Sequence, residues 1–308
     1  MLLYFLGTGA GKPSLERNVT SLALRMPAPP GDVWLFDCGE GTQHQILASP
    51  WSLRKVTRIF VTHLHGDHIF GLPGLLASRS FSSKDVPLNL YGPMGLRRFV
   101  ETALDVSGTR LSYPLEIREL RPDEELEIED WRVRLALLEH GLPSYGYRLE
   151  EPDRPGRLDA ERLKELKVPP GPIYGLLKAG ETVTLDDGRV INGQDFVGPP
   201  RRGRHVVILG DTRYTAASLK LAKEADVLVH EATFGGKLED RAYEFFHSTT
   251  LQAAQIAKDA DVKMLILTHF SSRYTPQTYQ KLVGEARTVF PNTYLAEDHS
   301  SFAIPLTE

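Results

Sequence analysis

The chain has 308 residues, of which 41% are hydrophobic and 25% are charged, and its formal net charge is −4. This length and composition fit one large α/β domain or two smaller ones, and the acidic balance excludes the strongly basic chain typical of nucleic-acid-binding proteins. No segment has the length of a membrane span or the pattern of a signal peptide, and Cys38 is the only cysteine. We therefore expect a cytoplasmic protein without an intrachain disulfide and without a thiolate metal site.

Six short apolar runs read as buried strands, and each is followed by polar or ionisable residues. They begin at residues 33, 58, 133, 205, 226 and 263. Amphipathic patterns between them predict helices over 95–106, 249–260 and 275–290, and Thr249 with Gln252 forms a capping-box signature. Since α/β sheets build sites where several strands end, we expect the polar residues after the strands to share one edge.

The first loop reads G-T-G-A-G-K-P at residues 7–13 and resembles a phosphate-binding loop only superficially. The residues that such a loop requires are absent, because Leu6 and Pro13 stand at two required positions. We interpret the glycines as a source of backbone flexibility near the site.

The densest motif follows the second predicted strand, where residues 63–68 read H-L-H-G-D-H. In an extended chain, residues two apart point the same way, so His63 and His65 can bind one ion, and the following turn directs Asp67 and His68 toward a second. Without sulfur ligands, imidazole and carboxylate favour Zn²⁺, and Mn²⁺ is also possible. The alternative is a solvated histidine-rich turn that binds no metal.

Later strand ends can complete a site for two metal ions. His140, Asp211 and His269 each follow a predicted strand. Taken singly, each would be read as an ordinary surface or capping residue. Together with the cluster they complete a ligand set, in which Asp211 could bridge the two ions with one oxygen on each. Asp37, after the first strand, could orient a ligand histidine, or it could serve only a structural turn.

Residues 151–204 interrupt this pattern, because they are rich in proline, glycine and charge and contain few apolar runs. Their charges nearly cancel, with 10 Lys and Arg against 9 Asp and Glu. The R-R-G-R at 201–204 is the one concentrated basic spot and a candidate for phosphate contacts. The insert is either a surface excursion or a small functional arm.

The T-H-x-H-x-D-H motif with later His, Asp and His resembles the metallo-β-lactamase superfamily, which implies an αββα sandwich with its metal site at one edge of two packed sheets. Finer motifs resemble the ribonuclease Z family, which removes the 3′ trailer from precursor tRNA. These motifs are H-E-A-T at 230–233, H-S-T at 247–249 and P-P-G-P at 169–172.

The resemblance to ribonuclease Z implies a single domain over residues 1–308 in which 151–204 form an inserted tRNA-binding arm, and it implies a homodimer. One loop departs from the family pattern P-x-K-x-R-N, because residues 13–18 read P-S-L-E-R-N with Leu15 in place of lysine. In the family this loop bears on the discrimination of tRNAs that already carry CCA, so that property stays open. By position, the family's metal ligands fall on His63, His65, Asp67, His68, His140, Asp211 and His269.

The expected reaction is hydrolysis of the phosphodiester at the 3′ end of the tRNA, which leaves a 3′-hydroxyl on the tRNA. Two Zn²⁺ ions can hold a water as hydroxide near neutral pH, and this hydroxide would attack the phosphorus in line. Asp67 would take the proton of that water. Through the resemblance, His247 is the acid that protonates the departing 3′ oxygen, and Glu231 is the carboxylate that keeps His247 protonated.

Two other classes of protein remain open. The same dinuclear site could act on small phosphodiesters or sulfate esters, but a small substrate needs no distant arm. A noncatalytic RNA-binding protein could retain the ligands, but a complete ligand set together with an acid argues against it. The expected partner is therefore precursor tRNA, with no role for a membrane.

Overall fold

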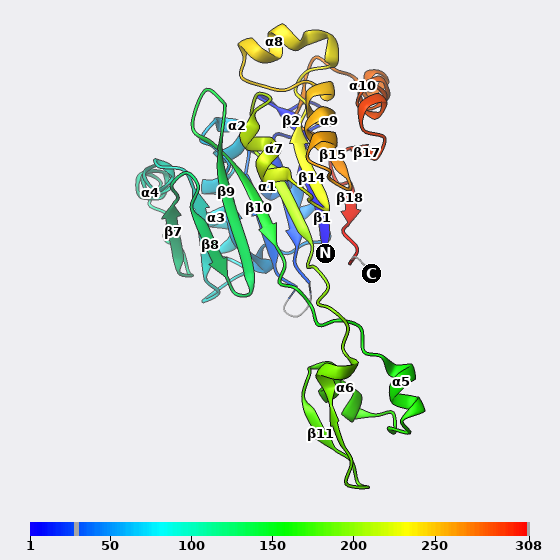
Figure 1. The fold of residues 1–308 in the computed structure, drawn as a ribbon. Helices are drawn as coiled ribbons and strands as arrows, with labels where there is room; N and C mark the ends of the chain where they lie inside the picture. Colours follow the sequence, from blue (N-terminus) through cyan, green and yellow to red (C-terminus); the bar gives the residue numbers. More distant parts are fainter. Residues whose placement is uncertain (28–30, 307–308) are drawn as a thin grey trace. The chain divides into compact units, whose positions relative to one another are not determined.

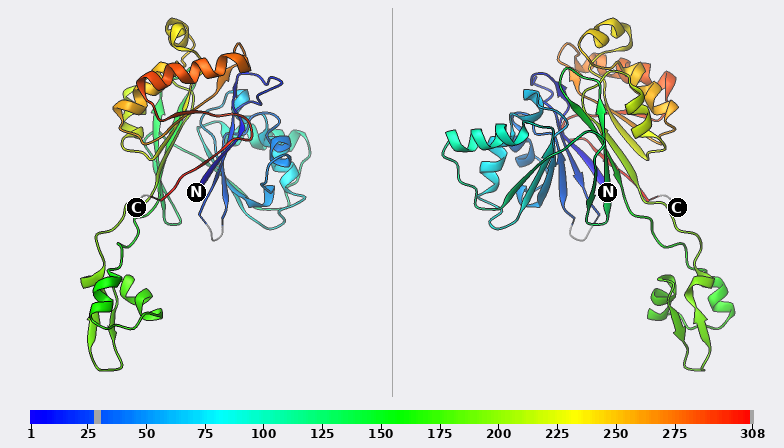
Figure 2. Two further views of the ribbon diagram at one scale, coloured as in Figure 1. Left: turned by 90° about the vertical axis from the view of Figure 1, so that its right-hand side faces the viewer. Right: turned by 60° about the vertical axis from the view of Figure 1, so that its left-hand side comes forward.

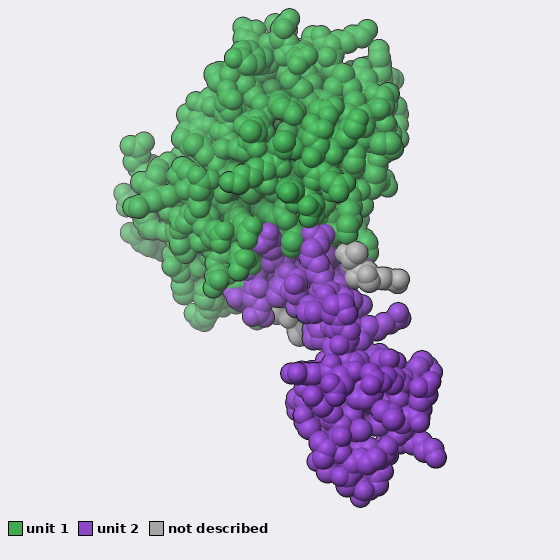
Figure 3. Space-filling view, in the orientation of Figure 1, with its two compact units in different colours: residues 1–128, 132–149, 205–305 green, residues 129–131, 150–204, 306–308 purple. Residues whose placement is uncertain are grey.

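The computed structural model describes residues 1–27 and 31–306. Its contacts divide the chain into two compact units (Figure 1, Figure 3). The smaller unit is built mainly from residues 150–204, and the larger unit comprises residues 1–128, 132–149 and 205–305.

Two seven-stranded sheets form the larger unit. In spatial order, sheet one contains β18 (Ser301–Ala303), β1 (Leu2–Gly7), β3 (Ser21–Arg25), β4 (Val33–Phe36), β5 (Val56–Phe60), β6 (Leu88–Gly92) and β7 (Leu115–Glu119). Sheet two contains β17 (Thr293–Leu295), β15 (Leu265–Thr268), β14 (Val227–Glu231), β13 (His205–Leu209), β10 (Ser144–Glu150), β9 (Trp131–Leu138) and β8 (Glu125–Ile128).

Aromatic side chains pack between the two sheets. The ring of Tyr147 on β10 lies 5.3 Å from that of Phe60 on β5, and Phe60 stacks on Phe36 of β4 at 5.1 Å. The hydroxyl of Tyr147 donates to the Val61 carbonyl at 2.6 Å. This hydrogen bond offsets the desolvation of the buried hydroxyl, and it joins β10 of sheet two to the residue that follows β5 of sheet one.

Helices cover the outer face of each sheet, as Figure 2 shows. One apolar cluster joins sheet one to α1 (Thr42–Leu47), α3 (Leu72–Arg79) and α4 (Leu96–Val106). Another joins sheet two to α7 (Ala216–Ala222), α9 (Thr250–Asp259) and α10 (Pro276–Val289). The layers are helix, sheet, sheet and helix, which confirms the expected αββα sandwich.

The predicted elements appear close to their expected bounds. The six apolar runs form β4, β5, β9, β13, β14 and β15, and the three predicted helices are α4, α9 and α10. Thr249 caps α9 with the predicted capping box, since its side chain accepts from the Gln252 N–H and Gln252 accepts in return from the Thr249 N–H. The remaining elements are α2 (Gly66–Ile69), α8 (Glu239–Glu244), the paired β2 (Gly9–Ala10) and β16 (Phe270–Ser271), and the 3₁₀ turns Leu53–Lys55 and Gly236–Leu238.

Parallel pairing places several strand ends at one edge. In sheet one β4, β5 and β6 are parallel neighbours, and in sheet two β13, β14 and β15 are. The carboxyl ends of parallel strands meet at the same edge, and the loops that follow them carry the polar motifs of the sequence.

The smaller unit has its own core. It contains α5 (Ala160–Glu165), α6 (Pro172–Lys178), the hairpin of β11 (Thr182–Thr184) and β12 (Val190–Asn192), and the 3₁₀ turn Gly193–Phe196. Six apolar side chains bury one another there, namely Leu163, Val168, Leu177, Leu185, Ile191 and Phe196. The scarcity of apolar runs in this segment therefore does not prevent a compact fold.

No helix within residues 1–27 and 31–306 is both long and apolar enough to span a bilayer.

Candidate metal and catalytic site

The seven residues predicted as metal ligands converge at the shared edge of the two sheets. Within each of three overlapping groups, the ligand atoms lie within 4.8 Å of one another. The groups are His63 with His65 and His140, Asp67 with His68 and His269, and Asp211 with His63 and His68.

The first group consists of three imidazole nitrogens. Nδ1 of His65 lies 3.0 Å from Nε2 of His63 and 3.1 Å from Nε2 of His140. A tetrahedral Zn²⁺ site with bonds of about 2.0–2.1 Å separates its ligand atoms by about 3.3–3.4 Å. The spacing of these nitrogens therefore fits one such ion.

The second group, Asp67 with His68 and His269, has two nitrogens and one carboxylate oxygen, and an oxygen of Asp211 lies beside it. Nε2 of His68 and Nε2 of His269 are 3.4 Å apart, and Oδ2 of Asp67 lies 3.5 and 3.3 Å from them. Oδ2 of Asp211 lies 3.5 Å from His68 and 3.3 Å from His269. These five distances match the edges of a tetrahedron around a second ion.

Asp211 connects the two groups. The same oxygen, Oδ2, that contacts the second group also lies 3.7 Å from Nε2 of His63 in the first. Asp211 therefore approaches both groups with one oxygen, whereas we expected one oxygen for each ion.

Hydrogen bonds on the far side of each ring fix which nitrogen faces the centre. Nδ1–H of His68 donates to Oδ2 of Asp37 at 2.7 Å, and Nδ1–H of His140 donates to the Phe246 carbonyl at 2.8 Å. A ring that donates from Nδ1 while neutral presents a lone pair at Nε2. The contact with His68 gives Asp37 the orienting role considered for it from the sequence.

Two threonine hydroxyls orient the other buried ligand rings in the same way. The hydroxyl of Thr62 donates to Asp37 at 2.8 Å and therefore accepts from Nδ1–H of His63 at 3.0 Å. Similarly, the hydroxyl of Thr233 donates to the Glu231 carboxylate and accepts from Nδ1–H of His269 at 2.9 Å. Four lone pairs thus point inward beside two carboxylates, an arrangement that repels itself unless a cation lies between them.

The electrostatics of the first group favour neutral rings. Burial lowers the pKa of His63 well below its ordinary value, and it lowers the pKa of His65 in the same direction. Neutral imidazole is the form that binds a metal ion, so burial prepares these two side chains as ligands.

The second group attracts positive charge. Burial alone would lower the pKa of His68, but the carboxylates of Asp211 and Asp37 outweigh burial and raise the pKa well above its ordinary value. Burial alone would raise the pKa of Asp211, but the nearby rings of His269 and His68 hold that pKa well below its ordinary value. A divalent cation would satisfy the same carboxylates without a proton on the rings.

His247 and Glu231 form a charged pair beside the metal ligands. Nδ1–H of His247 donates to Oε1 of Glu231 at 2.8 Å, and Oε2 of Glu231 accepts the hydroxyl of Thr233 at 2.7 Å. Burial lowers the pKa of His247, but the Glu231 carboxylate and then Asp211 raise it to about 9. The pair is therefore ionised at neutral pH, and Nε2–H of His247 remains for an acceptor in the cleft.

Three non-glycine residues at the site adopt positive φ. The angles are 57° at Asp37, 58° at His269 and 59° at Phe246. Such a conformation is uncommon for side-chain-bearing residues, and its cost is of order 1–3 kcal/mol each when other contacts enforce it. Here the enforced bends turn two side chains and one carbonyl toward the metal ligands.

Several groups that orient the predicted ligands carry little or no signal in the sequence. Gly11, with φ 72°, donates its N–H to Oδ2 of Asp67 at 2.7 Å. The flexible glycine loop thus orients a ligand, a role that needs left-handed backbone. The H-E-A-T motif contains Thr233 and could have indicated its role in orienting a ligand. Nothing in the sequence marks the Phe246 carbonyl.

The loop over residues 13–18 divides into an exposed and a buried part. Leu15 is fully exposed. Arg17 is buried, donates to the Ala296 carbonyl at 2.7 Å, and has its guanidinium carbon 4.1 Å from the centre of the Tyr279 ring. Arg17 therefore supports the loop from inside.

Within the R-R-G-R segment, Arg204 is not available for a phosphate contact, which corrects that part of the prediction. Arg204 is only 5% exposed and forms a two-pronged ion pair with Glu151, at 2.7 Å from Nε and 2.6 Å from Nη2. A guanidinium held by a carboxylate in this way is already neutralised. The partner lies 53 residues earlier, so the sequence alone did not reveal it.

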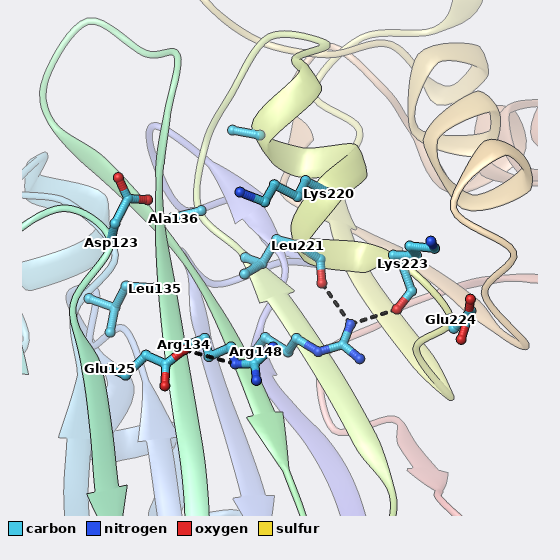
Figure 4. A pocket seen from close by; sticks show the side chains of 11 residues that line it. Asp123, Glu125, Arg134, Leu135, Ala136, Arg148, Lys220, Leu221, Lys223 and Glu224 are labelled. Carbon is cyan, nitrogen blue, oxygen red and sulfur yellow. Dashed lines mark hydrogen bonds and ion pairs between the residues drawn. The ribbon is translucent and has the colours of Figure 1, made fainter.

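Two hollows in the larger unit differ in chemistry. One has a volume of about 330 Å³ and is lined by the predicted ligands His65, Asp67, Asp211 and His269 together with His247. The other, of about 790 Å³, lies among β8, β9, β10 and α7 (Figure 4). Its lining contains none of the predicted ligands, and its arginines pair within the wall, Arg134 with Glu125 at 3.1 Å and Arg148 with the Leu221 and Lys223 carbonyls at 2.8 and 2.7 Å. The smaller hollow is therefore the candidate active site.

Comparison with known proteins relates the whole chain to tRNA-processing enzymes. The family described as “Anti-Pycsar protein Apyc1” matches residues 1–152. Ribonuclease Z of Geobacillus kaustophilus is 56% identical over 305 residues, which cover 99% of each chain. The crystal structure of human tRNase Z, short form, is 32% identical with a TM-score of 0.71, and the match covers 99% of this chain and 100% of that one. A metallo-β-lactamase fold protein from Bacillus subtilis shares the fold, with 17% identity, a TM-score of 0.69 and coverage of 98% of each chain.

Proposed function

Because the chain belongs to the ribonuclease Z family and is a tRNA 3′-processing endoribonuclease, we propose that it cleaves precursor tRNA with two divalent cations held by its seven converging histidines and aspartates. The observation that carries this proposal is the inward orientation of the imidazole lone pairs beside Asp67 and Asp211. The first cation would be held by His63, His65 and His140, the second by Asp67, His68 and His269, and Asp211 would bind both.

The donor set suits zinc, since nitrogen and carboxylate oxygen atoms at tetrahedral spacing are typical zinc ligands, although Mn²⁺ accepts the same atoms. When bound, two such cations supply a strong nucleophile from water and offset the negative charge that builds on the phosphoryl oxygens.

Asp67 is placed to receive the proton of the attacking water. Its Oδ2 faces the second group and accepts from Gly11, whereas Oδ1 makes no hydrogen bond to any described residue. Burial raises the pKa of Asp67, but the neighbouring imidazoles of His269 and His68 together outweigh burial and hold that pKa below its ordinary value. The carboxylate therefore keeps a free oxygen in the cleft for proton transfer.

His247 is the proposed proton donor to the departing 3′ oxygen of the tRNA. A 3′ alkoxide is a poor leaving group unless it receives a proton as the bond breaks. The hydrogen bond to Glu231 leaves Nε2–H of His247 directed away from that carboxylate, and His247 lines the cleft. Glu231 keeps the imidazolium protonated and fixes the ring.

The test of this function is incubation of the purified, zinc-loaded protein with a precursor tRNA and mapping of both product ends. We expect a 3′-hydroxyl on the tRNA and a 5′-phosphate on the trailer, as attack by water with loss of the 3′ oxygen requires. Running a second precursor that encodes CCA determines how the loop with Leu15 treats such tRNAs. A 2′,3′-cyclic phosphate on the tRNA would refute attack by water.

We also propose that residues 150–204 bind the tRNA body, that the enzyme acts as a homodimer and that it works in the cytoplasm. These proposals rest on the family membership, and the compact core of the smaller unit supports the first. Light scattering during size-exclusion chromatography tests the dimer, because it yields twice the chain mass of 34.4 kDa only if two copies associate.

A further inference from the structure

One wall of the cleft combines aromatic rings with guanidinium groups. This aromatic–arginine wall consists of Arg241 and Phe245 on and after α8, Phe234 in the loop after β14, and Arg273 after β16, and all four line the cleft. The ring centres of Phe234 and Phe245 are 6.5 Å apart. The guanidinium carbon of Arg241 lies 6.0 Å from the Phe245 ring, and that of Arg273 lies 4.8 Å from the Phe234 ring.

The exposed parts of this wall are free to meet a ligand. Phe234 is buried, but Phe245 is 51% exposed, and both arginines are exposed. Neither Arg241 nor Arg273 has a carboxylate within 4.0 Å among residues 1–27 and 31–306. In a chain with a net charge of −4, two guanidinium groups without acidic partners at the rim of a cleft are positioned for external anions.

The wall is held rigidly against the catalytic groups. The guanidinium of Arg213, two residues after Asp211, packs between the rings of Tyr243 and Phe246 at 3.7 and 3.9 Å. Its Nε–H donates to the Tyr243 carbonyl at 2.7 Å. The N–H of His247 donates to the Ala242 carbonyl at 2.8 Å. The end of α8 that carries Phe245 is thus fixed to the same segments that place the metal ligand and the proton donor.

The neighbours of His247 indicate which part of the RNA meets the wall. The centre of the His247 ring lies 5.5 Å from that of the predicted ligand His269 and 6.1 Å from that of Phe234 in the wall. In an in-line displacement the leaving oxygen departs opposite to the attacking water, and His247 marks that side. The nucleoside that carries the departing 3′ oxygen therefore extends past His247 toward Phe234 and Phe245.

We propose that Phe245 stacks on the base of the last nucleotide of the tRNA body, and that Arg241 and Arg273 bind the phosphates that flank the scissile bond. This inference rests on the proposed function and adds the site for the terminal nucleotide to it. Stacking on an aromatic ring tolerates any base, because every base has a π face. The wall would therefore accept tRNAs that differ in their last nucleotide.

The test combines Phe245→Ala with precursor tRNAs that lack one base. On the intact precursor, we expect Phe245→Ala to lower kcat/KM by about 5- to 150-fold, the range for loss of one stacked base. On the wild-type enzyme, removal of the base of the last body nucleotide should cause a similar loss. Phe245→Ala should lose little more on that abasic substrate, because the base and the ring act as one pair, and Phe245→Tyr should restore the rate.

Several outcomes would overturn the inference while leaving the proposed function intact. The first is an unchanged rate in Phe245→Ala. The second is a loss for Phe245→Ala on the abasic substrate as large as its loss on the intact precursor. The third is a loss of rate when the base of the first trailer nucleotide, and not that of the last body nucleotide, is removed. A wild-type enzyme that does not cut the intact precursor would refute the proposed function itself. The matched control is Phe81→Ala, because Phe81 is 93% exposed and does not line the cleft.

The arginines have a separate readout. Arg241→Gln and Arg273→Gln should each raise KM for the precursor about 10-fold and lower the slope of log affinity against log salt concentration by about 1, because each removes one phosphate contact. Zinc content and hydrolysis of bis(p-nitrophenyl) phosphate, which lacks flanking phosphates, should stay within twofold of wild type. Arg98→Gln, at an exposed arginine of α4, is the control, and an unchanged salt slope in both cleft variants would contradict the phosphate contacts.

Discussion

At the scale of single residues, the site depends on groups that never touch the substrate. Four acceptors, namely Asp37, Thr62, Thr233 and the Phe246 carbonyl, take a hydrogen bond from an imidazole Nδ1–H and so decide which nitrogen of each ring faces inward. An imidazole with its proton on the inward nitrogen cannot bind a cation. Under the proposed function, metal binding would therefore depend on these orienting partners as much as on the ligands.

Replacement of Asp37 by asparagine tests this orientation. An amide in place of the carboxylate removes the negative charge and can present an N–H to Nδ1 of His68, which would move the ring proton to the inward nitrogen. We expect the affinity for zinc to fall about 10- to 100-fold, measured by competition with a chromophoric chelator. Asp105→Asn, at an exposed position of α4, should leave the affinity unchanged, and equal affinities for both variants would refute the orienting role.

His247→Ala should separate proton donation from metal binding. We expect turnover of precursor tRNA to fall by about 10²- to 10⁴-fold with unchanged zinc content, because the departing 3′ oxygen loses its acid. Asp67→Ala should lower both turnover and zinc content. His247→Ala should retain far more activity on bis(p-nitrophenyl) phosphate, because the leaving group of that substrate departs without a proton. Equal loss on both substrates would count against the proton-donor role of His247.

At the scale of elements, the sequence predicted which polar residues follow strands, and the structure brings those residues together. The apolar runs before Asp37, His63, Asp211 and His269 are continuous because both sheet faces are covered, and this pattern is legible in the sequence. The strand β10 was not predicted, because S-Y-G-Y-R-L-E interrupts its apolar residues with glycine and arginine, although six of its seven residues are buried.

Contacts between distant segments could not be predicted from local patterns. Arg204 looked like a basic surface residue until its pairing with Glu151 became visible. The glycine loop at residues 7–13 looked permissive rather than functional, because its contact with Asp67 spans 56 positions. In each case the role is set by tertiary packing, which neither periodicity nor residue type encodes.

The smaller unit gives a prediction at the same scale. Replacement of residues 153–202 by a short glycine-serine linker keeps the pair of Glu151 and Arg204 that closes its base. We expect weaker binding of precursor tRNA, seen as a rise in KM of at least 10-fold, with unchanged hydrolysis of bis(p-nitrophenyl) phosphate. A parallel loss on both substrates would show that the segment supports the active site instead of binding tRNA.

At the scale of the whole molecule, the residues proposed to bind metal come from both halves of the sandwich. His63 and His68 follow a strand of sheet one, whereas Asp211 and His269 follow strands of sheet two. A cation bound to residues of both sheets binds the folded state alone, so metal binding should add to the free energy of unfolding.

Removal of metal should therefore destabilise the fold as well as abolish activity. At metal concentrations of 100 to 1,000 times the dissociation constant, each ion adds about 2.7–4.1 kcal/mol to the free energy of unfolding. We expect dialysis against a chelator to lower the thermal midpoint by several degrees in differential scanning fluorimetry, and added zinc to restore it. An unchanged midpoint after complete metal removal would mean that the ions do not connect the two sheets.

The most direct measurement of the central claim is anomalous diffraction at the zinc edge from crystals of the zinc-loaded, active enzyme. The account predicts two strong peaks in the cleft, one among His63, His65 and His140 and one among Asp67, His68 and His269, with Asp211 in contact with both. A single peak, or peaks at other residues in an enzyme that still cleaves precursor tRNA, would contradict it.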